Sequence, residues 1–133
     1  MRQRRKSVYY AHAMCIYGRD AEREELSTIR RYLPKSRIVN PADYSRDPEK
    51  VADTMGFCLG LVAGADSLVF SRLLGKVTAG VGKEVNHAIR LGKPVFELRA
   101  QKLVKRMRPL AYLTRRATLK LYERWRYLNG WGR

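Results

Sequence analysis

The segment from Thr78 to Glu84 holds the residue types best suited to bind and act on a phosphorylated ligand. It reads Thr-Ala-Gly-Val-Gly-Lys-Glu and lies between two short apolar runs. A glycine-rich turn that leads from a strand into a helix directs backbone N–H groups and the positive helix end toward one point. Glu84 falls in the first turn of this helix, so the sequence predicts an anion cradle beside a carboxylate. An enzyme that acts on a phosphorylated sugar needs this combination.

Each of these residues also has a purely structural explanation. A glutamate in the first helical turn stabilises the helix dipole by roughly 0.3–1 kcal/mol without any ligand. Gly80 and Gly82 are expected wherever a turn requires residues without a side chain. The turn therefore indicates a site only together with its position in the fold.

Strand and helix patterns alternate along the chain around this turn. Strands are predicted where β-branched and aromatic residues cluster, and helices where apolar residues recur at helical spacing behind a capping residue or proline. The predicted strands are Ser7–His12, Arg37–Val39, Ser67–Phe70 and Pro94–Leu98. The predicted helices run from Asp20 to about Leu33, from Asp47 to about Ala63 with Gly64 as the stop, and from the glycine-rich turn to Gly92.

This alternation predicts an α/β fold, a three-layer flavodoxin/Rossmann-like parallel sheet with helices on both faces and a basic C-terminal helix. Ligands of such sheets bind outside the carboxyl ends of the strands. His12, Asn40, Ser71 and the Thr78–Glu84 turn all follow strand ends. We therefore expect them to lie at one edge of the sheet.

The charge of the chain is concentrated at its two ends. The net charge is +16 over 133 residues. Residues 1–6 carry four Lys/Arg and no acid, residues 99–133 carry eleven Lys/Arg against Glu123 alone, and residues 7–98 are nearly neutral. We expect a basic N-terminal extension over 1–6, an α/β core over 7–98 and a basic C-terminal extension over 99–133. Basic ends of this kind bind nucleic-acid phosphates, improve solubility or meet an acidic subunit surface.

The C-terminal extension has its own pattern. Lys102–Met107 is expected as an edge strand, and Thr114 is expected to cap a last helix that packs on the core or on a partner subunit. The apolar and aromatic side chains of this helix are Leu121, Tyr122, Trp125 and Leu128.

Composition places the chain among ordinary folded proteins. Its 45% apolar content suits one globular domain, and no apolar run approaches the roughly 20 residues of a membrane span. Cys15 and Cys58 lack metal-ligand spacing and are too few for a disulfide framework. We expect a cytoplasmic protein with no metal and no cofactor.

Several segments resemble the nucleoside 2-deoxyribosyltransferase superfamily. They are Val8-Tyr9-Tyr10-Ala11, Ala65-Asp66-Ser67-Leu68-Val69-Phe70, Gly80-Val81-Gly82-Lys83-Glu84 and Gly92-Lys93-Pro94-Val95. The resemblance covers roughly residues 7 to 98. The turn looks closest to the branch that hydrolyses deoxynucleoside 5′-monophosphates, because Thr78 stands where that branch has a phosphate-binding hydroxyl residue and the transferase branch a carboxylate.

The resemblance implies a role for each matched residue. Glu84 would be the nucleophile that attacks the anomeric carbon, and Tyr9 would orient and activate it. Thr78 and the amides around Gly80 and Gly82 would hold the phosphate, with Lys83 as an extra positive charge. His12 and Asn40, at strand ends, complete the predicted binding residues, and His12 is either a polar contact or a general acid.

One position departs from the family pattern. Eight residues before Asp66 the family has an aspartate that donates a proton to the leaving base, and this chain has Cys58. A thiol with a pKa near ~8.5 is a weak acid for that step. Asp43, Asp47 and His12 are the possible replacements, whereas Asp53 is expected to point away from Cys58.

Three functions follow from these observations. The first is an N-glycosidase or 2-deoxyribosyltransferase acting on a (deoxy)nucleoside 5′-monophosphate. The second is a nucleotide-binding protein without turnover, and the third a basic nucleic-acid-associated protein on the same fold. A homo-oligomer, such as a dimer, is also expected, because the resembled family often completes its site with a neighbouring subunit.

Overall fold

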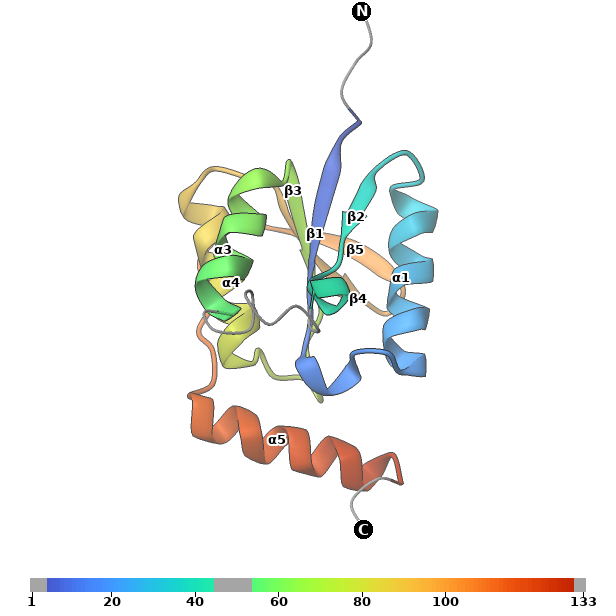
Figure 1. Ribbon diagram of the computed structural model, residues 1–133, viewed down its shortest axis with the longest axis vertical. Helices are drawn as coiled ribbons and strands as arrows, with labels where there is room; N and C mark the ends of the chain where they lie inside the picture. The colour runs from blue at the N-terminus through green and yellow to red at the C-terminus, as the bar shows by residue number, and fades with distance from the viewer. Residues whose placement is uncertain (1–4, 45–53, 131–133) are drawn as a thin grey trace, which may run out of the picture.

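One mostly parallel sheet organises the chain, of which the computed structural model describes residues 5–44 and 54–130 (Figure 1). The strand order is β2-β1-β3-β4-β5. The first four strands in chain order run parallel, and β5 lies antiparallel to β4 at the edge. The strands are β1 (Ser7–Ala11), β2 (Arg37–Val39), β3 (Ser67–Phe70), β4 (Val95–Arg99) and β5 (Lys102–Arg106).

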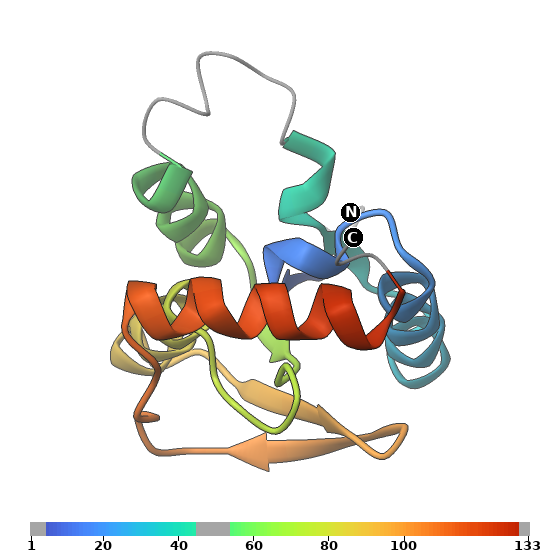
Figure 2. The same cartoon turned by 90° about the horizontal axis from the view of Figure 1, so that it is seen from below.

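Helices cover both faces of this sheet, which confirms the predicted fold class. α1 (Asp20–Tyr32) lies on one face, and α3 (Thr54–Gly64) and α4 (Ala79–Arg90) lie on the other (Figure 1). α5 (Arg115–Leu128) crosses the end of the molecule where the parallel strands finish (Figures 1 and 2). The predicted helix start at 47–49 lies outside the described residues, and α3 ends at Gly64 as expected. None of the helices in the described ranges is both long and apolar enough for a membrane crossing.

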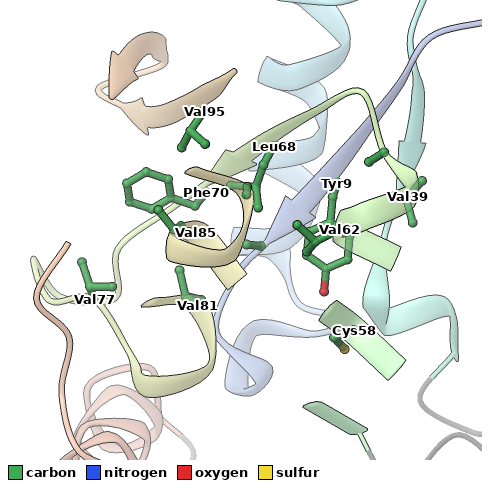
Figure 3. Close-up of a cluster of buried hydrophobic side chains, with 13 residues drawn as sticks. Tyr9, Val39, Cys58, Val62, Leu68, Phe70, Val77, Val81, Val85 and Val95 are labelled. Carbon is green, nitrogen blue, oxygen red and sulfur yellow. The ribbon is translucent and has the colours of Figure 1, made fainter. Parts of the chain in front are cut away.

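Alternation along β1 divides its two tyrosines between the faces of the sheet. Tyr9 packs on the α3–α4 side in a cluster with Val62, Leu68 and Val85 (Figure 3). Tyr10 packs on the α1 side with Ile29. Both tyrosines are fully buried. Because neighbouring side chains of a strand point in opposite directions, only Tyr9 can reach groups on α3 and α4.

The strand order places a topological switch point between β1 and β3. From β1 the chain moves to β2 on one side, and α3 then carries it back past β1 to β3 on the other side. The connections at the carboxyl ends of β1 and β3 therefore diverge and leave a crevice there. The short 3-10 helix η1 (Met14–Ile16) after β1 and the N-terminus of α4 after β3 border this crevice.

The C-terminal extension is tied to the core at several points. It supplies β5, so the boundary expected after residue 98 falls within β4. The Asn86 side chain on α4 exchanges two hydrogen bonds with the backbone of Leu110, at 2.8 and 2.9 Å, and the Leu113 amide donates to the Val77 carbonyl at 2.9 Å. Thr114 then caps α5 by accepting the amide of Ala117 at 3.1 Å. These bonds hold the segment before Thr114 against the core and therefore determine where α5 begins.

Candidate functional site

A pocket of about 500 Å³ lies at the switch point, between α3, α4, η1 and α5. Its size is that of a small-molecule site. Five of the predicted site residues line it: His12, Cys58, Thr78, Gly80 and Glu84. Residues that the sequence separates widely thus meet at the edge where ligands of parallel sheets bind.

Glu84 is the central side chain of this pocket. It lies in the second turn of α4 and not in the first turn as predicted, because the helix already begins at Ala79, and it is 6% exposed. The Tyr9 hydroxyl reaches it from β1 and donates a hydrogen bond to Glu84 Oε2. The Cys58 thiol on α3 lies within hydrogen-bonding reach of both residues. In Figure 3 the Tyr9 ring extends from β1 toward Cys58. The carboxyl group is therefore held in one orientation by groups from two other elements.

Burial dominates the electrostatics of Glu84. It raises the pKa of this carboxyl to about 7, although hydrogen bonds from Tyr9 and Cys58 act in the opposite direction. The same burial, with Glu84 nearby, raises the pKa of Cys58 to about 11. Near neutral pH the carboxyl group is therefore divided between its acid and its ionised form, while the thiol keeps its proton. A carboxyl group tuned in this way is typical of functional sites.

Thr78 contributes a buried hydroxyl group whose hydrogen-bonding capacity is unused. It occupies the N-cap position of α4, yet its side chain makes no capping hydrogen bond. Among the described residues, Thr78 Oγ1 is the one buried side-chain polar atom without a hydrogen-bond partner. The Tyr122 phenol lies nearby, but no hydrogen bond of normal geometry joins the two hydroxyls. A buried hydroxyl without a partner costs about 1–3 kcal/mol, so its retention calls for a function.

The first amides of α4 add to this polar surface. The Ala79 amide donates to Thr118 Oγ1 on α5 at 2.9 Å, and the Gly82 amide donates to the Thr78 carbonyl at 2.9 Å. Within the described part of the chain, no acceptor serves the amides of Gly80 and Val81. One hydroxyl and two N–H donors are therefore free at the positive end of a helix, which is an arrangement that binds an oxyanion.

Three predicted binding residues do not reach the pocket. Gly82 packs against Tyr112, because a Cβ at position 82 would lie 2.3 Å from that side chain, so its lack of a side chain serves packing rather than phosphate binding. Lys83 is exposed and is absent from the pocket wall. Asn40 is buried, and its side chain bonds Glu22 and the Ala42 amide instead.

His12 lines the pocket, but its polar atoms are already engaged. Nε2 lies 2.7 Å from Glu22 Oε2, and Nδ1 lies 3.0 Å from the Tyr10 carbonyl oxygen. Its ring stacks on Tyr10 with centroids 3.7 Å apart, and the Tyr17 ring is tilted against it at 4.7 Å. Both ring nitrogens face acceptors, so His12 cannot donate a proton to a ligand without breaking one of these contacts. The structure favours the polar-contact role over the general acid.

The carboxylates beneath His12 belong to a separate buried network. Burial acts to raise the pKa of Glu22, but the bonds from His12 and from the Gly18 amide outweigh it and lower the pKa. Glu25 accepts hydrogen bonds from Tyr10 at 2.5 Å and Ser71 at 2.7 Å. These groups join α1 to the ends of β1 and β3. Ser71, another polar residue at a strand end, lies outside the pocket because its hydroxyl bonds Glu25 in this network.

The pocket residues that the sequence analysis did not predict include two tyrosines and two arginines. Tyr17 comes from the loop after η1, and Arg115, Tyr122 and Arg126 come from α5. Burial raises the pKa of Tyr17, with further rises from Glu84 and Cys58, so its hydroxyl is a neutral hydrogen-bond donor beside the central carboxyl. The only sequence signal for the α5 residues was the aromatic and basic character of the tail, which does not specify where the helix packs.

The pocket has one carboxyl group and two cations among its described lining residues. Glu84 is the carboxyl group, and the cations are Arg115 and Arg126. Asp43 is exposed and lies elsewhere, and Asp47 and Asp53 fall outside the described residues. In the described ranges no group of three or more His, Cys, Asp or Glu side chains could hold a metal ion. The charge balance of the wall suits an anionic organic ligand.

A second hollow, of about 580 Å³, lies between α1 and the β4–β5 hairpin. Exposed charged side chains such as Arg23, Glu24 and Arg31 line it. Since it holds neither the unpaired buried hydroxyl nor a carboxyl group with a strongly raised pKa, the smaller pocket at the switch point is the better candidate site.

No protein-family model matches the chain, and a search of curated proteins finds no significant match. The resemblance to the nucleoside 2-deoxyribosyltransferase superfamily therefore remains an expectation based on the residues quoted above.

Proposed function

We propose that this protein binds a nucleoside 5′-monophosphate in the switch-point pocket and cleaves or transfers its N-glycosidic bond with Glu84 as the nucleophile. The observation that carries the proposal is the presence of two complementary groups in one pocket. The unpaired Thr78 hydroxyl stands at the N-terminus of α4, and the Glu84 carboxyl, held by Tyr9, stands further along the same helix. The hydroxyl is suited to bind a phosphate, and the carboxyl group is suited to attack a sugar carbon.

The phosphate end supports the proposal through hydrogen-bond donors. Thr78 Oγ1 and the amides of Gly80 and Val81 would each donate to a phosphate oxygen. A bound phosphate would accept hydrogen bonds from these three donors, which otherwise have no partner among the described residues. It would also place its negative charge at the positive end of the α4 dipole.

The carboxyl end supports a covalent mechanism. Ionised Glu84 would attack C1′ through Oε1 while Tyr9 holds Oε2. A bond forms between Oε1 and C1′, the C1′–N bond breaks with its electron pair leaving on the base, and the base takes up a proton from water. Water, or a second base in a transfer reaction, attacks C1′ and releases Glu84.

Proton delivery to the leaving base is the weak point of this mechanism. Retaining glycosidases use a second carboxyl group about 5–5.5 Å from the nucleophile, and Glu84 is the only carboxyl group among the described residues of the pocket wall. Cys58, with a pKa of about 11, donates poorly. This observation favours a second candidate function, a nucleotide-binding protein that keeps the cradle without efficient turnover.

The test is to incubate the full chain with deoxyribonucleoside and ribonucleoside 5′-monophosphates and to measure free base by chromatography. We expect base release that Glu84→Ala abolishes while the protein stays folded by circular dichroism. Nucleotide binding without base release supports the second candidate. Neither binding nor release for any monophosphate contradicts both functions.

A further inference from the structure

α5 is held against the pocket by contacts within its own chain. Thr118 Oγ1 accepts the Ala79 amide at 2.9 Å, and the Tyr122 hydroxyl accepts the Met14 amide at 3.3 Å. Trp125, 9% exposed, packs with Ile16 and Leu73 near the end of the sheet. Viewed from below, the helix runs across η1 and the start of α4 (Figure 2). The helix is therefore a wall of the site and not a detached basic tail.

These contacts place Arg115 next to the N-terminus of α4. Residues three apart on a helix share a face, so Arg115 lies on the side of α5 where Thr118 meets Ala79. Arg115 and its neighbour Arg116 are both exposed, but Arg115 lines the pocket and Arg116 does not. Neither arginine has an ion-pair partner among the described residues. Within the part of the chain that the structure describes, Arg115 is thus a cation without an ion-pair partner, close to the Thr78 hydroxyl and the first amides of α4.

The position of Arg115 at the start of α5 is electrostatically unfavourable as long as no anion lies beside it. Arg115 and Arg116 stand in the first helical turn, and that turn contains no acidic residue. Cations at the positive end of a helix are disfavoured. The N-terminus of α4, which is also positive, abuts the same turn through the Ala79–Thr118 bond. An anion at this point would interact favourably with both helix ends and with the guanidinium group.

We propose that Arg115 is the charged ligand of the phosphate subsite, and that α5 completes the site within a single chain. This inference rests on the proposed function and names the residue that makes the pocket prefer a monophosphate to an uncharged nucleoside. A guanidinium group can donate two parallel hydrogen bonds to one phosphate. The Thr78 hydroxyl and the Gly80 and Val81 amides would occupy its other oxygens.

If α5 completes the site, nucleotide binding does not require a neighbouring subunit. The resembled family led us to expect that a neighbouring subunit completes the site. Here α5 of the same chain already lines the pocket and supplies Arg115, Tyr122 and Arg126. One chain should therefore bind one nucleotide, with an affinity that does not depend on protein concentration.

The experiment compares Arg115→Gln with the matched control Arg116→Gln in the full chain. Isothermal titration calorimetry would measure binding of dAMP, dGMP, dCMP and dTMP and of the four corresponding deoxynucleosides, at two protein concentrations. We expect Arg115→Gln to weaken monophosphate binding by roughly tenfold to a hundredfold, the value of a charged hydrogen bond, and to leave nucleoside binding unchanged. Arg116→Gln should change either affinity less than about twofold. Thermal melting would verify that both exposed substitutions leave the fold intact.

The outcomes separate this inference from the proposed function. If the unmodified protein binds none of the monophosphates, both fall. If it binds them and Thr78→Val weakens binding but Arg115→Gln does not, the proposed function stands and the role of Arg115 is overturned. Equal losses in Arg115→Gln and Arg116→Gln also overturn that role, because the general positive field of α5 would then be responsible. An affinity that rises with protein concentration overturns the single-chain site.

Discussion

Tyr9 and Glu84, 75 residues apart, are joined by a hydrogen bond from the tyrosine hydroxyl to Glu84 Oε2. The bond connects β1, an interior strand of the sheet, to α4, the helix that Thr78 precedes. Tyr9 is fully buried and Glu84 is 6% exposed. Because burial raises the pKa of Glu84 to about 7 and Tyr9 opposes that rise, the tyrosine helps to set the pH at which the carboxyl ionises. Catalysis and stability should therefore both depend on this pair.

Base release should increase with pH through neutrality. Only the ionised form of Glu84 is a nucleophile, and its pKa is about 7. We expect kcat/KM to rise up to about pH 7 and to level off above about pH 8. Rates measured between pH 5.5 and 8.5 would show this. Constant activity down to pH 5.5 would contradict it, since Glu84 would then be ionised throughout.

Tyr9→Phe should shift this pH profile upward. The substitution removes a hydrogen bond that lowers the pKa of Glu84 and leaves the ring packing in place. A bond worth about 1.4 kcal/mol would correspond to an increase of about one pH unit in the midpoint. Tyr10→Phe is the matched control, because Tyr10 bonds Glu25 on the other face of the sheet and should leave the midpoint unchanged. A midpoint that stays in place or falls in Tyr9→Phe would argue against the coupling.

Glu84→Gln should stabilise the fold at alkaline pH. The folded-state pKa of about 7 exceeds the ordinary value of 4.5, so the folded protein holds the proton more tightly than the unfolded chain. The stability that the protonated carboxyl contributes is full below pH 4.5 and is lost as the pH rises through 7, by about 3 kcal/mol in total. Glutamine resembles the protonated acid and should keep that stability.

Urea denaturation at pH 5 and pH 8 would measure the effect. The free energy of unfolding of Glu84→Gln should exceed that of the unmodified protein clearly at pH 8 and only slightly at pH 5. Glu24→Gln, at an exposed position of α1, is the control and should show no such difference. The prediction is refuted if Glu84→Gln is destabilised to the same extent at both pH values.

Thr78→Val should separate binding from stability. Valine has nearly the shape of threonine and removes a buried hydroxyl without a partner, so stability should stay constant or increase by about 1 kcal/mol. Monophosphate affinity should fall about tenfold. Thr118→Val is the informative contrast, because it leaves the Ala79 amide without its acceptor and should cost about 1–3 kcal/mol. Similar destabilisation of both variants, measured by denaturation, would mean that Thr78 is paired in solution.

The two glycines of the turn should respond differently to alanine. A Cβ at Gly82 would lie 2.3 Å from Tyr112, whereas a Cβ at Gly80 would meet Met55 at 3.6 Å, an ordinary contact. We expect Gly82→Ala to cost about 1–3 kcal/mol through overpacking, and Gly80→Ala to keep or slightly raise stability through helix propensity. Thermal melting compares them directly. Equal stability of the two variants would show that the segment around Tyr112 moves aside easily.

The sequence was informative wherever local patterns decide structure. Alternating strand and helix patterns predicted the parallel sheet, and Lys102–Met107 was expected as an edge strand, which β5 confirms. The Thr78–Glu84 turn was predicted to leave a strand and to open a helix, as α4 does. These features depend on residue spacing over one or two turns, on glycine and proline positions and on apolar periodicity. All of them can be recognised within a short window of the chain.

The environment of each site residue depended on the tertiary structure. The strand order decided that Tyr9 faces α3 and α4, and burial set the pKa of Glu84. The path of residues 107–114 along α4 brought Thr118 to Ala79, 39 residues away, and made α5 a wall of the pocket. The sequence determined that a hydroxyl and a carboxyl stand at the start of one helix. Only the packed structure decided that the hydroxyl is left unpaired and the carboxyl buried, because desolvation and hydrogen-bond satisfaction depend on all elements that surround a group and not on its neighbours in the chain.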